Sequence, residues 1–276
     1  MEKSQIERLK DGTIKLTITI PKEKVSKARE DAIVHIAKQA NLPGFRKGKA
    51  PEKLVEEKLD KAEIQEDVLK NLLPAAYQEA VLQHQLRPIM SPKIHIEKLE
   101  EDMDWTLDAI TCEAPVVEAG DYKTSVKNVT AKSKIIIPGK EEKKPTFEEI
   151  AKALLEKAEV AIPDVLLEQE TDRLLSQLLA DIKKLGLNLE QYLASTKRTP
   201  DDLRAEYANR ARDDMKLEFI LQKIAENEKI TVEDREIEEA IQKAKSDEER
   251  KHLEGNRYML AAILRQQKTL DFLMGL

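Results

Sequence analysis

The stretch Thr13-Ile-Lys-Leu-Thr-Ile-Thr-Ile20 alternates apolar and polar side chains over its whole length. The apolar residues of this run share one face, which predicts a strand with one buried side: Ile14, Leu16, Ile18 and Ile20. Pro21 ends the strand and can open a helix. Residues 22–40 then place apolar side chains at helical spacing, so we expect a helix that faces the core.

The remainder of residues 1–115 continues this mixed pattern. Helical spacing resumes at Glu52 and runs to about Gln85, with Pro74 inside it as an expected bend or break. Two further strands are predicted at Lys93–Leu99 and Asp104–Thr111. Three strands with helices on one face make a small α+β fold. We therefore expect an α+β domain over residues 1–115, a small antiparallel sheet with a long helical hairpin.

The rest of the chain divides into a short middle zone and a helical zone. Residues 116–145 contain one or two strand-like runs and end in a charged, proline-bounded segment, which predicts a linker or extended segment. Residues 146–276 carry helix signals one after another. Helices are expected to start at Thr146, Pro163, Thr199, Thr231 and Asn256, and Gly186 is expected to stop the second of them. This pattern predicts an all-α domain of long helices that form arms.

Composition excludes several classes of protein. The chain has 276 residues, of which 36% are charged and 4% aromatic, and its net charge is −6. The longest run without a charged residue, Asn71–Gln78, is far shorter than the roughly 20 apolar residues of a transmembrane helix. Residues 1–8 lack the apolar core of a secretory signal, and Cys112 is the only cysteine. We expect a cytoplasmic protein without membrane segments or an intrachain disulfide.

The residues offer no pattern for catalysis. No glycine-rich phosphate loop is present, and the four histidines have no partner at metal-ligand spacing. Cys112 is expected to be a buried, small apolar residue rather than a nucleophile. Acidic pairs such as Glu56-Glu57 fit solvated, ion-paired helix faces better than catalytic carboxylates. We predict no catalytic residues, no metal and no cofactor.

One segment of this acidic chain is locally basic. Between Ala32 and Pro51 there is no acidic residue, and four basic residues are present. The tip segment, residues 41–51, joins two predicted helices and places Phe45 beside Arg46. An aromatic residue with arginine is typical of an interface anchor, and the flanking positive charge suits an anionic partner, either protein or RNA. The alternative is a solvated loop whose Phe45 folds back on its own hairpin.

Within the tip segment, Gly44-Phe-Arg-Lys-Gly-Lys-Ala-Pro51 resembles the ribosome-docking signature of the bacterial trigger factor family. Residues 162–174 are similar to the opening of that family's helical C-terminal domain, and residues 268–273 are similar to its end. The resemblance implies that Phe45, Arg46 and Lys47 contact ribosomal protein and RNA beside the tunnel exit. It implies supporting roles for other residues of the signature: Gly44, Gly48 and Pro51 would hold the tip, and Lys49 would add charge.

The resemblance also implies a function. An ATP-independent chaperone would dock on the large ribosomal subunit, and its helical arms would hold unfolded nascent polypeptides. It implies a homodimer off the ribosome. Family members usually carry a prolyl isomerase domain in the middle, which needs on the order of 80 residues. Only about 32 residues lie between Ala114 and Pro145, so we expect that domain to be missing and no enzyme activity.

Three other functions stay open at this stage. A prolyl isomerase with an unrecognised minimal site is opposed by the short middle zone. A periplasmic holdase of similar helical architecture is opposed by the lack of a leader and by the tip segment. A simple RNA-binding module would use the tip segment but leaves the acidic residues 146–276 unexplained.

Overall fold

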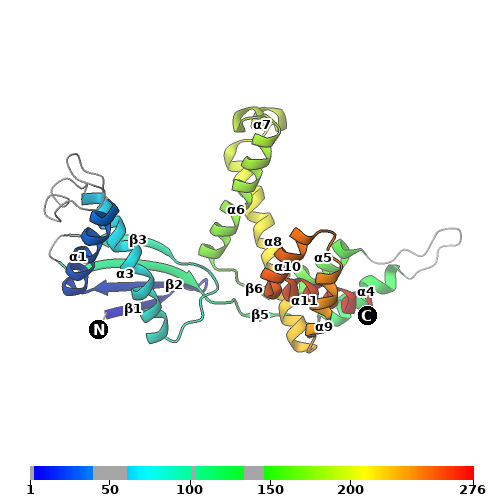
Figure 1. The fold of residues 1–276 in the computed structure, drawn as a ribbon. Helices are drawn as coiled ribbons and strands as arrows, with labels where there is room; N and C mark the ends of the chain where they lie inside the picture. The colour runs from blue at the N-terminus through cyan, green and yellow to red at the C-terminus, as the bar shows by residue number, and fades with distance from the viewer. Residues whose placement is uncertain (1–2, 40–60, 101–102, 134–145) are drawn as a thin grey trace. The chain divides into compact units, whose positions relative to one another are not determined.

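A computed structural model describes residues 3–39, 61–100, 103–133 and 146–276 (Figure 1). The chain separates into two compact units. The first unit is Met1–Ala114 with Pro163–Leu166, and the second is Pro115–Ile162 with Leu167–Leu276. The first is α+β and the second is mostly helical, as the sequence predicts.

The first unit is built on a four-stranded antiparallel sheet of order β1-β2-β4-β3. Its strands are β1 (Lys3–Arg8), β2 (Thr13–Ile20), β3 (Lys93–Lys98) and β4 (Trp105–Cys112). Leu16 of β2 lies opposite Ala109 of β4, and both side chains are fully buried. The predicted alternation in β2 is confirmed, because its four apolar residues are each at most 1% exposed.

Two helices cover the apolar face of this sheet (Figure 1). They are α1 (Lys22–Gln39) and α3 (Lys61–Gln83), and α3 continues through Pro74. Ala32 and Ile33 of α1 and Ile64 and Val68 of α3 belong to the same buried cluster as the β2 side chains. The packing of helices on one face of a small sheet therefore forms the core of this unit.

Strand β1 is missing from the sequence-based prediction. Ile6 is its one apolar residue, so the strand carries almost no alternation signal. It is an edge strand, and its pairing with β2 depends on backbone hydrogen bonds more than on apolar side chains. Charged side chains are typical of edge strands because they oppose pairing with other chains.

The opposite face of the sheet holds a buried carboxylate, Asp108, which is only 3% exposed. Its oxygens accept hydrogen bonds from Lys15 Nζ and Thr17 Oγ1, each at 2.7 Å. Burial alone would raise the pKa of Asp108, but these hydrogen bonds outweigh it and lower the pKa. The carboxylate therefore stabilises the pairing of β2 with β4 in its ionised form.

The second unit contains a two-stranded ribbon and a series of helices. The strands are β5 (Val117–Glu118) and β6 (Glu159–Val160). The helices are α4 (Tyr122–Ser133), α5 (Phe147–Lys157), α6 (Asp164–Lys184), α7 (Leu189–Thr196), α8 (Pro200–Asn227), α9 (Asp234–Gln242), α10 (Asp247–Gly255) and α11 (Arg257–Met274). The first turn of α6 falls in the range that groups with the first unit.

The predicted helix signals in this unit are confirmed. Thr146 and Thr199 each accept a hydrogen bond from the backbone N–H three residues on, and each forms a capping box. Pro200 is the first residue of α8, and Gly186 follows the end of α6 with a φ of 75°. Helices α7 and α10 are additional to the prediction.

The expectation of an extended segment over residues 116–145 is wrong for residues 122–133, which form α4. Tyr122, Val126 and Thr130 are spaced four residues apart and are all buried. Tyr122 and Val126 pack in one cluster with side chains of α5, α8 and α11. Contacts with distant parts of the chain thus stabilise a helix that few local signals favour. Residues 134–145 lie outside the described part.

A hydrogen-bond network fastens α4 to the end of α8. The Tyr122 hydroxyl donates to Glu228 Oε1 at 2.7 Å, and Lys123 Nζ lies 2.7 Å from the same oxygen. Burial and the bond to the Glu228 carboxylate raise the pKa of Tyr122. Gly120, just before α4, has a φ of 56°, and a Cβ there would lie 3.0 Å from the Lys157 carbonyl oxygen. The positive φ and the close carbonyl together favour glycine at this turn.

Candidate functional site

The residues predicted to bind the ribosome lie outside the described part of the chain. They are Gly44, Phe45, Arg46, Lys47, Gly48 and Lys49, all within residues 40–60. Their predicted roles remain untested by the structure. Three surfaces formed by the described residues have the apolar character of a binding site.

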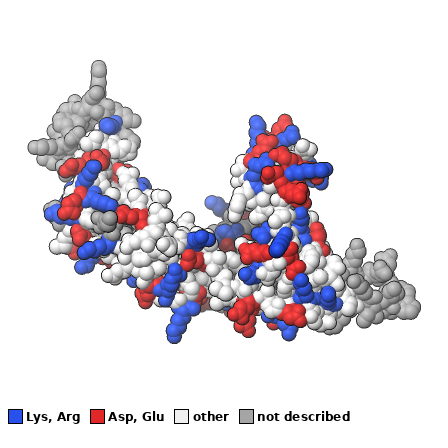
Figure 2. Space-filling model, turned by 90° about the horizontal axis from the view of Figure 1, so that it is seen from below, with Lys and Arg blue, Asp and Glu red and all other residues white. Residues whose placement is uncertain are grey.

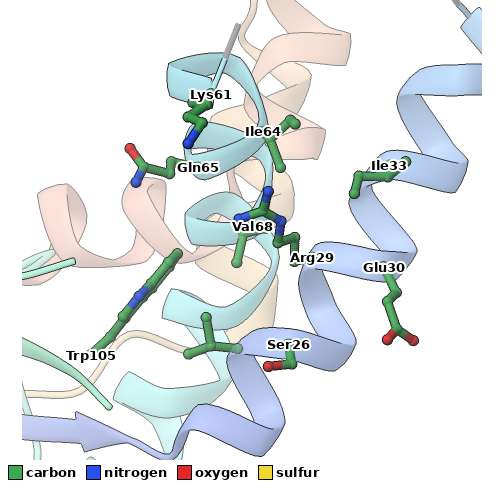
Figure 3. A pocket seen from close by; sticks show the side chains of 10 residues that line it. Ser26, Arg29, Glu30, Ile33, Lys61, Ile64, Gln65, Val68 and Trp105 are labelled. Carbon is green, nitrogen blue, oxygen red and sulfur yellow. The ribbon is translucent and has the colours of Figure 1, made fainter. Parts of the chain in front are cut away.

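A hollow of about 440 Å³ lies between α1 and α3 in the first unit (Figure 3). Its described apolar lining comes from Val25, Ile33, Ile64, Val68 and Trp105. Polar and charged side chains from both helices also line it: Ser26, Arg29, Glu30, Lys61 and Gln65. Because most of these apolar residues belong to the main core of the unit, the hollow is a widening of that core.

A larger groove, of about 740 Å³, lies in the second unit. Its described lining comes from α8, from α11 and from Thr231 and Val232 between α8 and α9. Tyr258, Met259 and Ile263 of α11 line it and are 91%, 52% and 54% exposed. We call this feature the α8–α11 groove. It is within the size range of ligand-binding pockets.

Helix α11 has apolar residues on two sides, and only one side packs against the core, so the apolar residues of the other side line the groove. Leu260, Ala261 and Leu264 pack with α9 in a small cluster, and Leu273 packs against residues of α8 in a larger one. Tyr258–Leu264 contains no charged residue, so apolar side chains remain on the other side of the helix. This uncharged run was the sequence signal for the groove, and the sequence-based prediction overlooked it.

Hydrogen bonds join α11 to the segment between α8 and α9, which also lines the groove. Arg265 Nε donates to the Ile230 carbonyl at 2.9 Å, and Lys268 Nζ donates to the Thr231 carbonyl at 2.8 Å. Lys268 Nζ also lies 2.9 Å from Glu236, in the first turn of α9. These bonds fix the connection between α8 and α9 onto α11, so the groove is formed before any ligand arrives.

A third apolar surface lies where α6 turns into α7. Leu179, Leu185, Leu187 and Leu189 are all exposed there, with Leu185 at 77%. We call these four residues the leucine tip. Asn188 caps α7 by accepting a hydrogen bond from the Gln191 N–H at 2.8 Å, so the turn is well defined although its leucines are unburied.

The leucine tip and the α8–α11 groove are well separated within the second unit. Helix α8 begins at Pro200 beside the end of α7 in sequence, and its groove residues are Glu218–Ala225. At 1.5 Å rise per residue, about 20 residues of helix span roughly 30 Å. One polypeptide would need on the order of ten extended residues to bridge the two surfaces.

The described residues do not assemble a catalytic or metal site. Cys112 is buried, and desolvation raises its pKa to about 11, so the thiol is un-ionised at neutral pH. No group of three potential metal ligands occurs in the described part of the chain. Among the helices of that same part, none combines the length and the apolarity that crossing a bilayer requires.

Family models account for the whole length of the fold. The model described as "Bacterial trigger factor protein (TF)" matches residues 2–138, and the model of its C-terminus matches residues 138–275. The chain belongs to the trigger factor family. The two models meet at residue 138, so no residues remain between them for an isomerase domain. The chain therefore lacks the middle domain, as its short middle zone predicts.

Individual trigger factors match part of this chain. Those of Staphylococcus epidermidis RP62A and Staphylococcus aureus Newman are each 38% identical over 108 residues, which is 39% of this chain. The match spans 25% of the length of those relatives.

A solved structure matches the whole fold. It was reported as "Promiscuous Substrate Recognition in Folding and Assembly Activities of the Trigger Factor Chaperone". The match has a TM-score of 0.67 and covers 98% of this chain and 99% of that one. At 15% identity it shows that the two proteins share their fold.

Proposed function

We propose that the protein is an ATP-independent molecular chaperone that holds unfolded polypeptides near the ribosome. The observation that carries this proposal is the set of apolar side chains left exposed on the second unit, in the α8–α11 groove and at the leucine tip. Exposed apolar surfaces of this kind mark interaction sites. Membership of the trigger factor family and the chaperone named for the solved structure with this fold agree with it.

The surroundings of these surfaces suit weak, reversible binding. Positive and negative side chains are interspersed over the face of the molecule seen in Figure 2, with uncharged areas between them. Small separate apolar surfaces bury little area each, so each supplies modest affinity. A client chain can then leave and fold, and no nucleotide is needed to release it.

We further propose that the tip segment docks the protein on the large ribosomal subunit in the cytoplasm. Phe45, Arg46 and Lys47 would contact ribosomal protein and RNA, and Gly44, Gly48 and Lys49 would support them. Support comes from the family membership and from the basic, aromatic composition of the segment. Basic side chains that bind RNA phosphates displace the counterions of the RNA. A higher salt concentration opposes this release, so binding to RNA weakens as salt rises.

Co-sedimentation with ribosomes tests the docking role. The triple variant Phe45→Ala, Arg46→Ala, Lys47→Ala should pellet at least tenfold less than the wild type, and moderate salt should weaken wild-type binding. The matched control removes one exposed apolar and two exposed basic side chains elsewhere: Met103→Ala, Lys243→Ala and Lys245→Ala. Equal pelleting of both variants would reject the docking role.

We infer that the chain has no prolyl isomerase activity, because no residues remain for the domain that would supply it. Purified protein should leave cis/trans exchange of a proline peptide at its spontaneous rate. Acceleration that scales with protein concentration and survives removal of contaminating isomerases would refute this inference.

A further inference from the structure

The hollow between α1 and α3 is large for a space at the edge of a core. Protein interiors are close-packed, and few of their voids exceed one water molecule. The hollow has about 440 Å³, which is the volume of about fifteen waters in the liquid and within the size range of ligand pockets. Its apolar floor consists of core side chains that are each at most 8% exposed: Val25, Ile33, Ile64, Val68 and Trp105. An apolar group of a ligand would therefore lie on surfaces that the core already fixes.

Positive charge predominates around the hollow. Three of its ten described lining residues are charged: Arg29, Lys61 and Glu30. Figure 3 shows Arg29 reaching from α1 towards α3, whereas Glu30 points away from α3. The lining therefore has a net positive charge, although the chain as a whole has a net charge of −6.

Both basic side chains can bind an added anion. Arg29 and Lys61 each already interact with another group of the protein. A guanidinium and an ammonium carry several N–H donors each, so they can bind a ligand anion in addition. A carboxylate suits this position because its paired oxygens match the fork of the guanidinium donors. The hollow thus combines an apolar floor with a cationic wall, which is the complement of an amphipathic anion.

We propose that the hollow between α1 and α3 binds a small amphipathic anion, an apolar chain or ring that ends in a carboxylate. The apolar part lies against the core side chains of the floor, among them Val68 and Trp105, and the carboxylate pairs with Arg29 and Lys61. The ligand then contacts both helices of the first unit. This site is separate from the apolar surfaces of the second unit and does not depend on the proposed holding function.

Trp105 can report on the hollow directly, because it lines the hollow and is the only tryptophan of the chain. The full chain is titrated with octanoate, octanol and octyltrimethylammonium, each at concentrations where the ligand is monomeric. The three ligands share their apolar chain and differ in the charge of the head group. Octanoate should change the Trp105 fluorescence saturably, and octanol should bind about tenfold less tightly, as expected for one lost charge-assisted hydrogen bond. The cation should bind still less tightly.

The variant Arg29→Gln tests the charge contact. It should weaken octanoate binding about tenfold and leave octanol binding unchanged, whereas a merely structural change would weaken both. Lys61→Gln gives the same test from α3 if Arg29→Gln does not fold. The matched controls, Lys27→Gln and Arg87→Gln, remove exposed charges outside the described lining of the hollow and should behave as the wild type.

The variant Ser26→Leu locates the bound ligand, because it adds an apolar side chain to the lining of the hollow. It should weaken octanoate and octanol binding alike. Equal responses of the wild type to all three ligands would mean adsorption to apolar surface in general and would overturn the proposal. Unchanged octanoate binding in both Arg29→Gln and Lys61→Gln, or in Ser26→Leu, would also overturn it. The holding function is measured with peptides, so these outcomes leave it untouched.

Discussion

Replacing the apolar rim of the α8–α11 groove should remove most of its affinity for unfolded chains. The variant Tyr258→Ser, Met259→Ser, Ile263→Ser takes away three side chains that line the groove and are more than half exposed. Because these side chains stand in solvent in the free protein, their apolar surface is available for burial by a ligand. Removing them should therefore act on binding far more than on folding.

The magnitude follows from their exposure. Full burial of a Met or Ile side chain is favourable by about 1.5–3 kcal/mol, and about half of each remains to be buried here, so each contributes about 1 kcal/mol. Tyr258 is 91% exposed, and covering one face of its ring buries about 100 Å², or about 2.5 kcal/mol. Side-chain ordering reduces the total of about 4.5 kcal/mol. We expect the Kd to rise by about 100-fold.

The assay is titration of a labelled, unfolded, apolar peptide with the full chain, followed by fluorescence anisotropy. A thermal melt of each variant accompanies it, because the buried halves of Met259 and Ile263 contribute about 1 kcal/mol each to folding, and binding is compared only at a temperature where every variant is folded. The matched control is Leu82→Ser, Ile89→Ser, Met103→Ser, three exposed apolar residues of the first unit. It should bind the peptide as the wild type does.

Two results would refute the reasoning. A rise in Kd of less than threefold for the groove variant, measured where the variant is folded, would mean that the exposed groove residues do not hold the peptide. An equal loss of binding by the control variant would mean that apolar exposure anywhere on the protein suffices, and that the groove has no particular role.

Three further predictions concern stability. Asp108→Ala should lower the free energy of unfolding of the first unit by about 2 kcal/mol, measured by urea denaturation, since the bonds from Thr17 and a lysine are lost. Because the folded-state pKa of Asp108 is lowered, this difference should be fully present above pH ~4 and shrink as pH falls through the folded-state pKa. Tyr122→Phe should destabilise the second unit by about 1 kcal/mol in calorimetry, because the bond to Glu228 is lost, and no change would exclude a stabilising role for that bond. Gly120→Ala should lower the melting temperature by several degrees because of the positive φ and the close Lys157 carbonyl, and an unchanged value would mean that the turn accepts a side chain without strain.

Local sequence patterns predicted those elements whose signals do not depend on distant contacts. The alternation of β2 identifies its buried face, and the Thr199-Pro200 start locates α8 because a cap and a first-turn proline act on adjacent residues. Strand β1 was missed because an edge strand needs little apolar surface. Helix α4 was missed because its stability comes from the residues that bury Tyr122 and Val126.

The proposed binding surfaces divide in the same way. The tip segment can be proposed from the sequence because its aromatic and basic residues lie within eleven consecutive positions. The α8–α11 groove is not evident, since Leu221 and Tyr258 are far apart in the chain and only helix packing brings them to one surface. A helical pattern shows which residues are apolar, but it does not show which of them the core leaves exposed.

The sequence by itself determined the α+β zone, the mostly helical zone, the missing middle domain and the family signature at residues 44–51, although it did not predict the short strand β6 within the helical zone. These depend on short-range periodicity, on length and on a contiguous motif. Only the tertiary structure decided that α4 packs within the helical unit, and that α11 leaves Tyr258, Met259 and Ile263 exposed in a groove with α8. The physical reason is that burial is a property of packed surfaces, and the neighbours that bury or expose a side chain come from distant parts of the chain.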